Sequence, residues 1–145
     1  MRRRQFFSTG VICSVYLLLR PERLFAAWNE KIFQRCTMQQ AFINALGTKE
    51  PVISDKITIV APPLAADASL VPVQVISSLK GEELYLFVEK NSTPLVFRLA
   101  LKGNALPWFA VNIKMKESSA LYAVVREGEN YFMTSVHIEV LVQAC

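Results

Sequence analysis

Cysteine is the residue type that offers covalent chemistry in this 145-residue chain, and it occurs three times. The last of the three, Cys145, follows a stretch with the alternating pattern of a β-strand, which runs V-H-I-E-V-L-V-Q-A-C from Val136. If strand pairing stops near Val140, the five residues after it extend to roughly 15 Å, at about 3.3 Å per residue. That reach suits a thiol that is offered to the pockets of other proteins. The alternative is that Cys145 has no chemical role.

Other reactive groups have little support in the sequence. The single histidine, His137, alternates with Ser135 and Glu139 on the face of the last strand that we expect to meet solvent. One histidine and the cysteines Cys36 and Cys145 are too few for an ordinary zinc site. The sequence has no glycine-rich phosphate loop and no serine in a nucleophile-elbow context. We therefore expect no catalytic residue, no metal ligands and no cofactor, and we interpret the chain as a protein that is not an enzyme.

The formal charge of +4 is concentrated at the N-terminus. The first 26 residues hold five of the 16 basic residues and one of the 12 acidic residues, which leaves eleven of each in the rest of the chain. A protein that binds nucleic acid needs an excess of basic charge on its surface. The chain beyond residue 26 has none, so its composition gives no support to nucleic-acid binding.

The N-terminal 26 residues have the features of a twin-arginine signal peptide. Arg3-Arg4 is followed by Gln5 and two bulky apolar residues, and the apolar stretch Gly10–Leu19 is too short to span a bilayer as a stable helix. Leu24-Phe25-Ala26 supplies a cleavage site. We expect residues 1–26, with Cys13, to be removed on export to the periplasm. The alternative is a basic amphipathic membrane anchor.

Residues 27–55 are predicted to form an N-terminal helix and a linker. Between Trp28 and Leu46 the apolar residues share one helical stripe, and Gly47 supplies a stop signal. Cys36 lies in that stripe, which indicates a packing role. The alternative is a disulfide between Cys36 and Cys145, which an oxidising compartment permits. Thr48–Ser54 is the expected linker.

From Lys56 onward the apolar residues alternate with period two, and turn signals such as Lys80-Gly81 interrupt the pattern. This predicts about seven strands without intervening helices, and we expect residues 56–145 to form an antiparallel β-sandwich of immunoglobulin-like type. Trp108 and Phe109 begin one strand, and one of them should fill the core. The predicted strands are Lys56–Val60, Leu70–Ile76, Leu84–Glu89, Val96–Leu101, Trp108–Met115, Ala120–Arg126 and Tyr131–Val142.

Four stretches of this domain also carry a family resemblance. They are S-D-K-I-T-I-V-A-P-P-L-A (54–65), V-P-V-Q-V (71–75), F-V-E-K-N-S-T-P-L (87–95) and N-I-K-M-K-E-S-S (112–119). Together with the leader, the N-terminal helix and the last strand, they resemble SoxY, the sulfur-carrier family of the bacterial thiosulfate-oxidising system. The resemblance covers nearly the whole chain.

The resemblance implies a periplasmic sulfur carrier that pairs with a second β-sandwich subunit, SoxZ. In that family a C-terminal cysteine, in a Gly-Gly-Cys-Gly-Gly arm, carries substrate sulfur covalently. It passes between a haem enzyme that loads it, a sulfatase-like hydrolase and a sulfur dehydrogenase. Carried over by position, the resemblance assigns the sulfur attachment to Cys145, as a cysteine S-thiosulfonate or persulfide.

The sequence departs from the family pattern at the arm itself. Gln143 and Ala144 stand where the family has two glycines, which adopt positive φ angles and enter a narrow pocket without a Cβ atom. Two interpretations therefore remain open. The chain is a carrier that works through Cys145, or it is a divergent SoxY-like scaffold that pairs with a SoxZ-like subunit and has an inactive cysteine arm.

The leader gives the first testable prediction. We expect N-terminal sequencing of the protein from the periplasm of its host to begin close after Ala26. A mature protein that still begins at Met1 would show that the leader is not cleaved.

Overall fold

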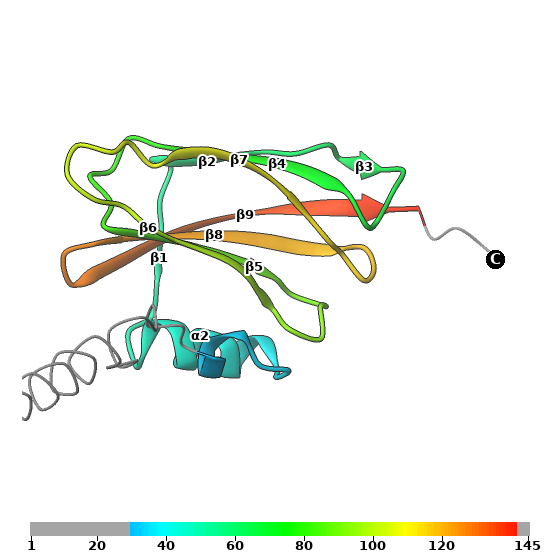
Figure 1. Cartoon of the computed structure of the whole chain (residues 1–145), viewed down its shortest axis with the longest axis horizontal. Coiled ribbons are helices and arrows are strands. Elements are labelled where there is room, and N and C mark those ends of the chain that lie inside the picture. The colour runs from blue at the N-terminus through cyan, green and yellow to red at the C-terminus, as the bar shows by residue number, and fades with distance from the viewer. Residues whose placement is uncertain (1–29, 142–145) are drawn as a thin grey trace, which may run out of the picture.

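The computed structural model describes residues 30–141 (Figure 1). The predicted signal peptide (residues 1–26), Trp28, and the arm from residue 142 to Cys145 lie outside the described residues. Within residues 30–141, none of the helices is both long enough and apolar enough to cross a membrane.

Two β-sheets and a helical layer form three stacked layers (Figure 1). The larger sheet has the strand order β1-β9-β8-β5-β6, with β3 paired to β9, and the smaller sheet has the order β2-β4-β7. Two helical elements lie against the larger sheet, on the face away from the smaller sheet (Figure 1). The elements are η2 Glu30–Phe33, α2 Met38–Leu46, β1 Val52–Ile53, β2 Ile57–Val60, β3 Leu64–Ala65, β4 Val71–Ser77, β5 Glu83–Val88, β6 Leu95–Ala100, β7 Trp108–Ile113, β8 Ser119–Glu127 and β9 Asn130–Val140.

Strand β5 is buried on both faces, which explains its nearly continuous apolar sequence. Leu84, Leu86 and Val88 pack with the smaller sheet in the main core, and all three are 0% exposed. The alternate residues Tyr85 and Phe87 point to the other side, where they pack in a second cluster with the helical layer. Because β5 belongs to both clusters, it joins the three layers into one unit.

The sequence predicted a mainly β, immunoglobulin-like sandwich with an N-terminal helix, and the structure confirms this fold class. All seven predicted strands are present. Two strands of two residues each, β1 and β3, were missed because two residues are too few to show an alternation. Both pair in parallel with β9, so the sandwich is not wholly antiparallel, and β1 lies inside the predicted linker.

The predicted N-terminal helix is interrupted in its described part. Element η2 ends at Phe33, and α2 begins only after Thr37, whose side chain accepts a hydrogen bond from the Gln40 amide as an N-cap. The amide of Cys36, between the two elements, donates to the carbonyl of Ser92 instead of to a helical neighbour. The predicted stop at Gly47 is confirmed, with φ at 73°.

Of the two aromatic residues at the start of β7, Phe109 is the one that fills the core. Its ring stacks on Phe97, with 4.8 Å between ring centroids. Trp108 points outward and is 63% exposed. The smaller sheet therefore presents a large aromatic side chain to solvent.

Candidate functional site

The described chain reaches the predicted carrier arm through the end of β9, and this end is held on both sides. The amide of Glu139 donates to the carbonyl of Pro63 (2.9 Å), and the amide of Leu141 donates to the carbonyl of Ala65 (3.0 Å). On the opposite side, the amide of Val140 donates to the Ser118 hydroxyl oxygen (2.8 Å). Three successive amides are thus fixed immediately before residue 142. We call residues 139–141 the arm root.

At the arm root, the Ser118 side chain makes the hydrogen bonds that the backbone of a neighbouring strand would otherwise make. The backbone pairing of β8 with β9 ends at Ser119 and Ile138. One residue further, the Ser118 hydroxyl accepts from the Val140 amide and donates to the Val140 carbonyl (3.4 Å). A side chain therefore satisfies both backbone groups of Val140, which is itself only 7% exposed.

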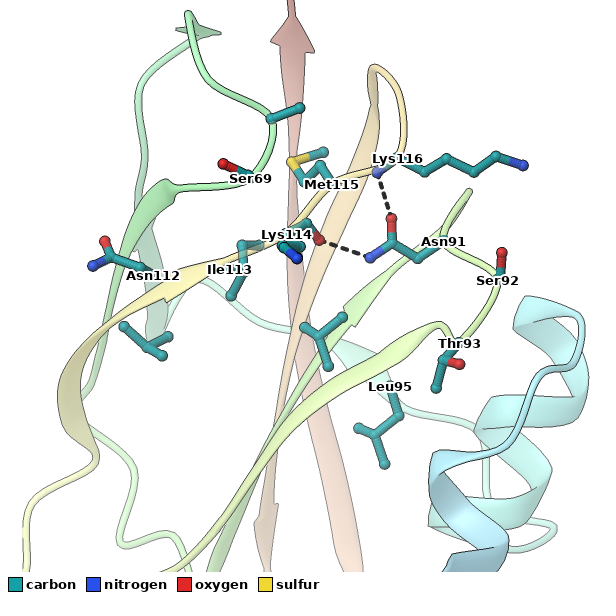
Figure 2. A pocket seen from close by; sticks show the side chains of 13 residues that line it. Ser69, Asn91, Ser92, Thr93, Leu95, Asn112, Ile113, Lys114, Met115 and Lys116 are labelled. Atoms are coloured by element: carbon teal, nitrogen blue, oxygen red, sulfur yellow. Dashed lines mark hydrogen bonds between the residues drawn. The ribbon is translucent and has the colours of Figure 1, made fainter.

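Asn91 fixes the segment that leads to Ser118. Its side-chain amide donates to the carbonyl of Lys114 (2.8 Å), and its side-chain oxygen accepts from the amide of Lys116 (2.8 Å) (Figure 2). These two bonds join the turn between β5 and β6 to the segment after β7. They bring together two of the stretches that carry the family resemblance, 87–95 and 112–119.

A hollow of about 740 Å³ lies between the edges of the two sheets, beside this asparagine (Figure 2). Leu95, Ile113 and Met115 line it with buried apolar side chains, and Lys114 and Lys116 are exposed at its margin. A smaller hollow of about 240 Å³ shares Ala68, Ser69 and Lys116 with it and reaches Leu141 of the arm root. Apolar walls with lysines at the margin can accept an apolar group or an anion.

Asp67, which lines the smaller hollow, is an ionised and locally satisfied carboxylate. Its Oδ1 accepts hydrogen bonds from the Ser69 hydroxyl (2.6 Å) and the Ser69 amide (2.8 Å). These hydrogen bonds lower the pKa of the Asp67 carboxyl, against a smaller effect of desolvation. The carboxylate therefore stabilises its own turn.

The other residues that the sequence singled out are His137, beside the arm root, Cys36, in the helical cluster, and Cys145, outside the described part. His137 is exposed and pairs with Glu139 (Nε2 to Oε1, 3.0 Å), on the solvent face where the alternation placed it. Cys36 is half-buried in the helical cluster, where its thiol donates to the carbonyl of Gln34 (3.3 Å). Cys145 lies outside the described residues, so its role and its pairing with Cys36 stay predictions. Among residues 30–141, no group of three or more His, Cys, Asp or Glu side chains could hold a metal ion.

A cluster of paired charges lies around Glu83, at the first residue of β5. Burial raises the pKa of the Glu83 carboxyl, but hydrogen bonds from Tyr85 and Arg98 and the charges of Arg98 and Arg126 outweigh it, so this pKa lies below its ordinary value. Arg126 also pairs with Glu82 (3.0 Å). Burial and the neighbouring Glu83 raise the pKa of the Tyr85 phenol. The charges of this cluster are mutually paired, which indicates a structural role.

Sequence reasoning identified neither Ser118 nor Asn91 as a positioning residue. Both occur in the stretches that carry the family resemblance, but each resembles an ordinary polar residue next to a turn. Their partners lie 22 to 25 residues away in the chain. The one available signal was that both stretches, 87–95 and 112–119, carry the same family resemblance.

Comparison with known proteins gives one family match and similar solved structures. The model of the family described as sulfur oxidation protein SoxY matches residues 43–145. Among solved structures, the sulfur carrier protein SoxY from Chlorobium limicola f thiosulfatophilum is similar, with 23% sequence identity and a TM-score of 0.67 over 73% of this chain and 97% of that chain. An engineered protein matches with 10% identity and a TM-score of 0.41 over 59% of this chain and 20% of its own. No curated protein sequence matches the chain.

The arm root gives the second prediction. Ser118→Ala removes the partner of the Val140 amide, and we expect it to lower the free energy of unfolding by about 1–2 kcal/mol, because a buried amide is left without an acceptor. Hydrogen exchange at the amides of Val140 and Leu141 should become faster.

The adjacent residue supplies the matched control. The Ser119 hydroxyl is buried and has no hydrogen-bond partner within residues 30–141, so Ser119→Ala should cost little stability. Equal unfolding free energies and equal exchange rates for the two variants would contradict the anchoring role of Ser118.

Proposed function

Because the chain belongs to the SoxY family of sulfur oxidation proteins, we propose that it carries thiosulfate-derived sulfur covalently on Cys145 and presents it to partner enzymes. The family match extends through residue 145, and so includes this cysteine. The observation that carries the proposal is the arm root, where three successive amides are hydrogen-bonded just before the segment that leads to Cys145.

The fixed root defines the region that the thiol can reach. Cys145 is the fourth residue after Leu141, and four residues span at most about 14 Å when fully extended. The arm root lies at the end of the sandwich where β3 pairs with β9 (Figure 1). A partner enzyme that docks at this end of the sandwich meets the Cys145 thiol within about 14 Å of the arm root.

The proposed loading step forms one bond and transfers two electrons. The Cys145 thiol loses its proton, and its sulfur bonds to the outer sulfur of thiosulfate, which gives a cysteine S-thiosulfonate. The two electrons released go to the haem enzyme that loads the carrier. Hydrolysis by a sulfatase-like enzyme then releases sulfate and leaves a persulfide on Cys145. In this scheme the chain itself is a carrier and not an enzyme.

We also propose that the chain works in the periplasm and pairs there with a SoxZ-like subunit. The twin-arginine leader supports export, and the family supports partnership with other Sox proteins. The chain beyond residue 26 has equal numbers of acidic and basic residues, so net charge contributes little to such a pairing.

The third prediction concerns Cys145. Incubation with the loading enzyme of the host and thiosulfate should add one reducible adduct, which intact-mass analysis detects, and Cys145→Ser should abolish it. Cys36→Ser is the matched control and should retain it. Alkylation of the native protein should label Cys145 before Cys36, because the Cys36 thiol is half-buried and hydrogen-bonded.

The rate of loading also tests the effect of the arm sequence. Gln143→Gly combined with Ala144→Gly should speed loading by a standard enzyme of the family, because glycines remove the Cβ atoms that widen the arm. If Cys145 carries no adduct, even after purification from the host and incubation with the native partners, the scaffold interpretation replaces the carrier. The observation that favours the scaffold interpretation is that Gln143 and Ala144 stand where the family has two glycines.

The fourth prediction concerns the partner. Co-expressed with the SoxZ-like chain of its host, the protein should co-elute with it in size-exclusion chromatography at both low and high salt, because net charge is not expected to hold the pair. Separate elution of the two chains at both salt concentrations would contradict the pairing, whatever the outcome at Cys145.

A further inference from the structure

The larger of the two hollows near the arm root has a positively charged margin (Figure 2). Among the described residues that line it, Lys114 and Lys116 are the charged ones, and the others are apolar or carry neutral polar side chains. Both lysines are exposed, and Met115 between them is buried, with 3% exposure. The hollow therefore combines an apolar wall with two ammonium groups at its edge.

The charges of these lysines are not neutralised within the described part of the chain. Among residues 30–141, neither Lys114 nor Lys116 forms an ion pair. The acidic residue of the smaller hollow, Asp67, accepts its hydrogen bonds from Ser69. Glu117, which follows Lys116, is exposed and lines neither hollow. The two ammonium groups therefore remain available to an anion.

Asn91 fixes the backbone from which both lysine side chains extend. Its side chain binds the carbonyl of Lys114 and the amide of Lys116, each at 2.8 Å (Figure 2). The backbone on both sides of Met115 is therefore held in one conformation. Because the two lysine side chains start from fixed points, they lose less conformational freedom on binding an anion than lysines in a free loop would lose.

The arm root places the C-terminal segment within reach of these lysines. Lys116 and Leu141 line the same smaller hollow, which shares part of its lining with the larger one. Lys116 also lies two residues before Ser118, whose hydroxyl binds Val140, so about 7 Å of chain separates it from that contact. Cys145 extends at most about 14 Å beyond Leu141. A group on its sulfur can therefore meet the Lys116 side chain.

We propose that Lys114 and Lys116 bind the anionic group on a loaded Cys145 and so distinguish the loaded arm from the unloaded arm. The inference rests on the proposed function, which makes this group a thiosulfonate with a negatively charged, oxygen-rich end. An ammonium group donates hydrogen bonds to such oxygens and pairs with their charge. A free thiol offers neither the charge nor the oxygens, so the unloaded arm gains nothing from the lysines.

The covalent link to the arm decides which anion the lysines hold. A single exposed ion pair is weak, so the two lysines retain a free anion poorly. An anion on a short arm has an effective concentration on the order of millimolar, because it cannot diffuse away. The lysines therefore act on the group at Cys145 in preference to anions in solution.

The fifth prediction tests this contact without the loading enzyme. In protein purified from the periplasm with Cys36→Ser, tetrathionate converts Cys145 to the thiosulfonate. The Cys145 thiolate attacks an inner sulfur, the central S–S bond breaks, and thiosulfate leaves with the electron pair. Intact-mass analysis verifies the adduct.

The measurement is the difference in amide NMR shifts between the loaded and the unloaded form of each protein. The amides of Met115 and Lys116 should shift on loading, because a charged group then lies against their segment. The difference should fall at least twofold in Lys116→Gln, since one exposed ion pair contributes modestly. It should vanish when Lys114→Gln is added, and high salt should reduce it in the wild type.

Two matched controls separate the charge from other effects. Methyl methanethiosulfonate places an uncharged methylthio group on Cys145, and this adduct should leave the shifts unchanged. Lys90→Gln removes a lysine that is exposed beside Asn91 but lines neither hollow, and it should behave like the wild type. Lys116→Arg keeps the charge and should retain the shift difference.

Three results would overturn the proposal. They are equal shifts with the uncharged adduct, an unchanged shift difference in the combined lysine variant, and no shift on loading of the wild type. The dispersion of the amide signals in each unloaded variant checks that it is folded. Because tetrathionate loads Cys145 chemically, a failure of the host enzyme to load it would contradict the carrier function and leave the lysine contact intact.

Discussion

Hydrogen bonding along both edges of β9 is the constraint on which the rest of the structure depends. One edge pairs with β8 from Asn130 to Ile138, and the other is met by β1 near Phe132 and by β3 at Glu139 and Val140. An exposed edge or a buried unpaired amide at the end of this strand would cost stability and leave the following residues without a fixed origin. Two short strands pair with the second edge of β9 near its two ends, and one serine hydroxyl binds Val140 where the pairing with β8 stops.

Much of the fold follows from local patterns in the sequence, because each long strand has enough residues for its alternation to be visible. What the patterns did not predict has both local and long-range causes. The apolar stripe from Trp28 to Leu46 continues past Thr37, but the threonine side chain caps a new helix there. Alternation placed Trp108 and Phe109 on opposite faces and could not say which face is the core, since that depends on the pairing of β7 with β4.

The candidate site was less predictable than the fold, because its contacts join residues that are distant in the chain. The sequence identified Cys145 from its residue type and position, yet Ser118 and Asn91 had no local feature to separate them from surface residues. Their partners become neighbours only when β5, β8 and β9 are assembled. The family resemblance contained this information without revealing its physical meaning, which is that the matching stretches meet around the arm root.

The arm root is joined to the smaller sheet as well as to the larger one. The segment after β2 runs to the arm root, where the carbonyls of Pro63 and Ala65 accept the amides of Glu139 and Leu141. Strand β2 belongs to the smaller sheet and β9 to the larger sheet. The position from which the arm extends is therefore fixed by both sheets of the sandwich, and not by the end of a single strand.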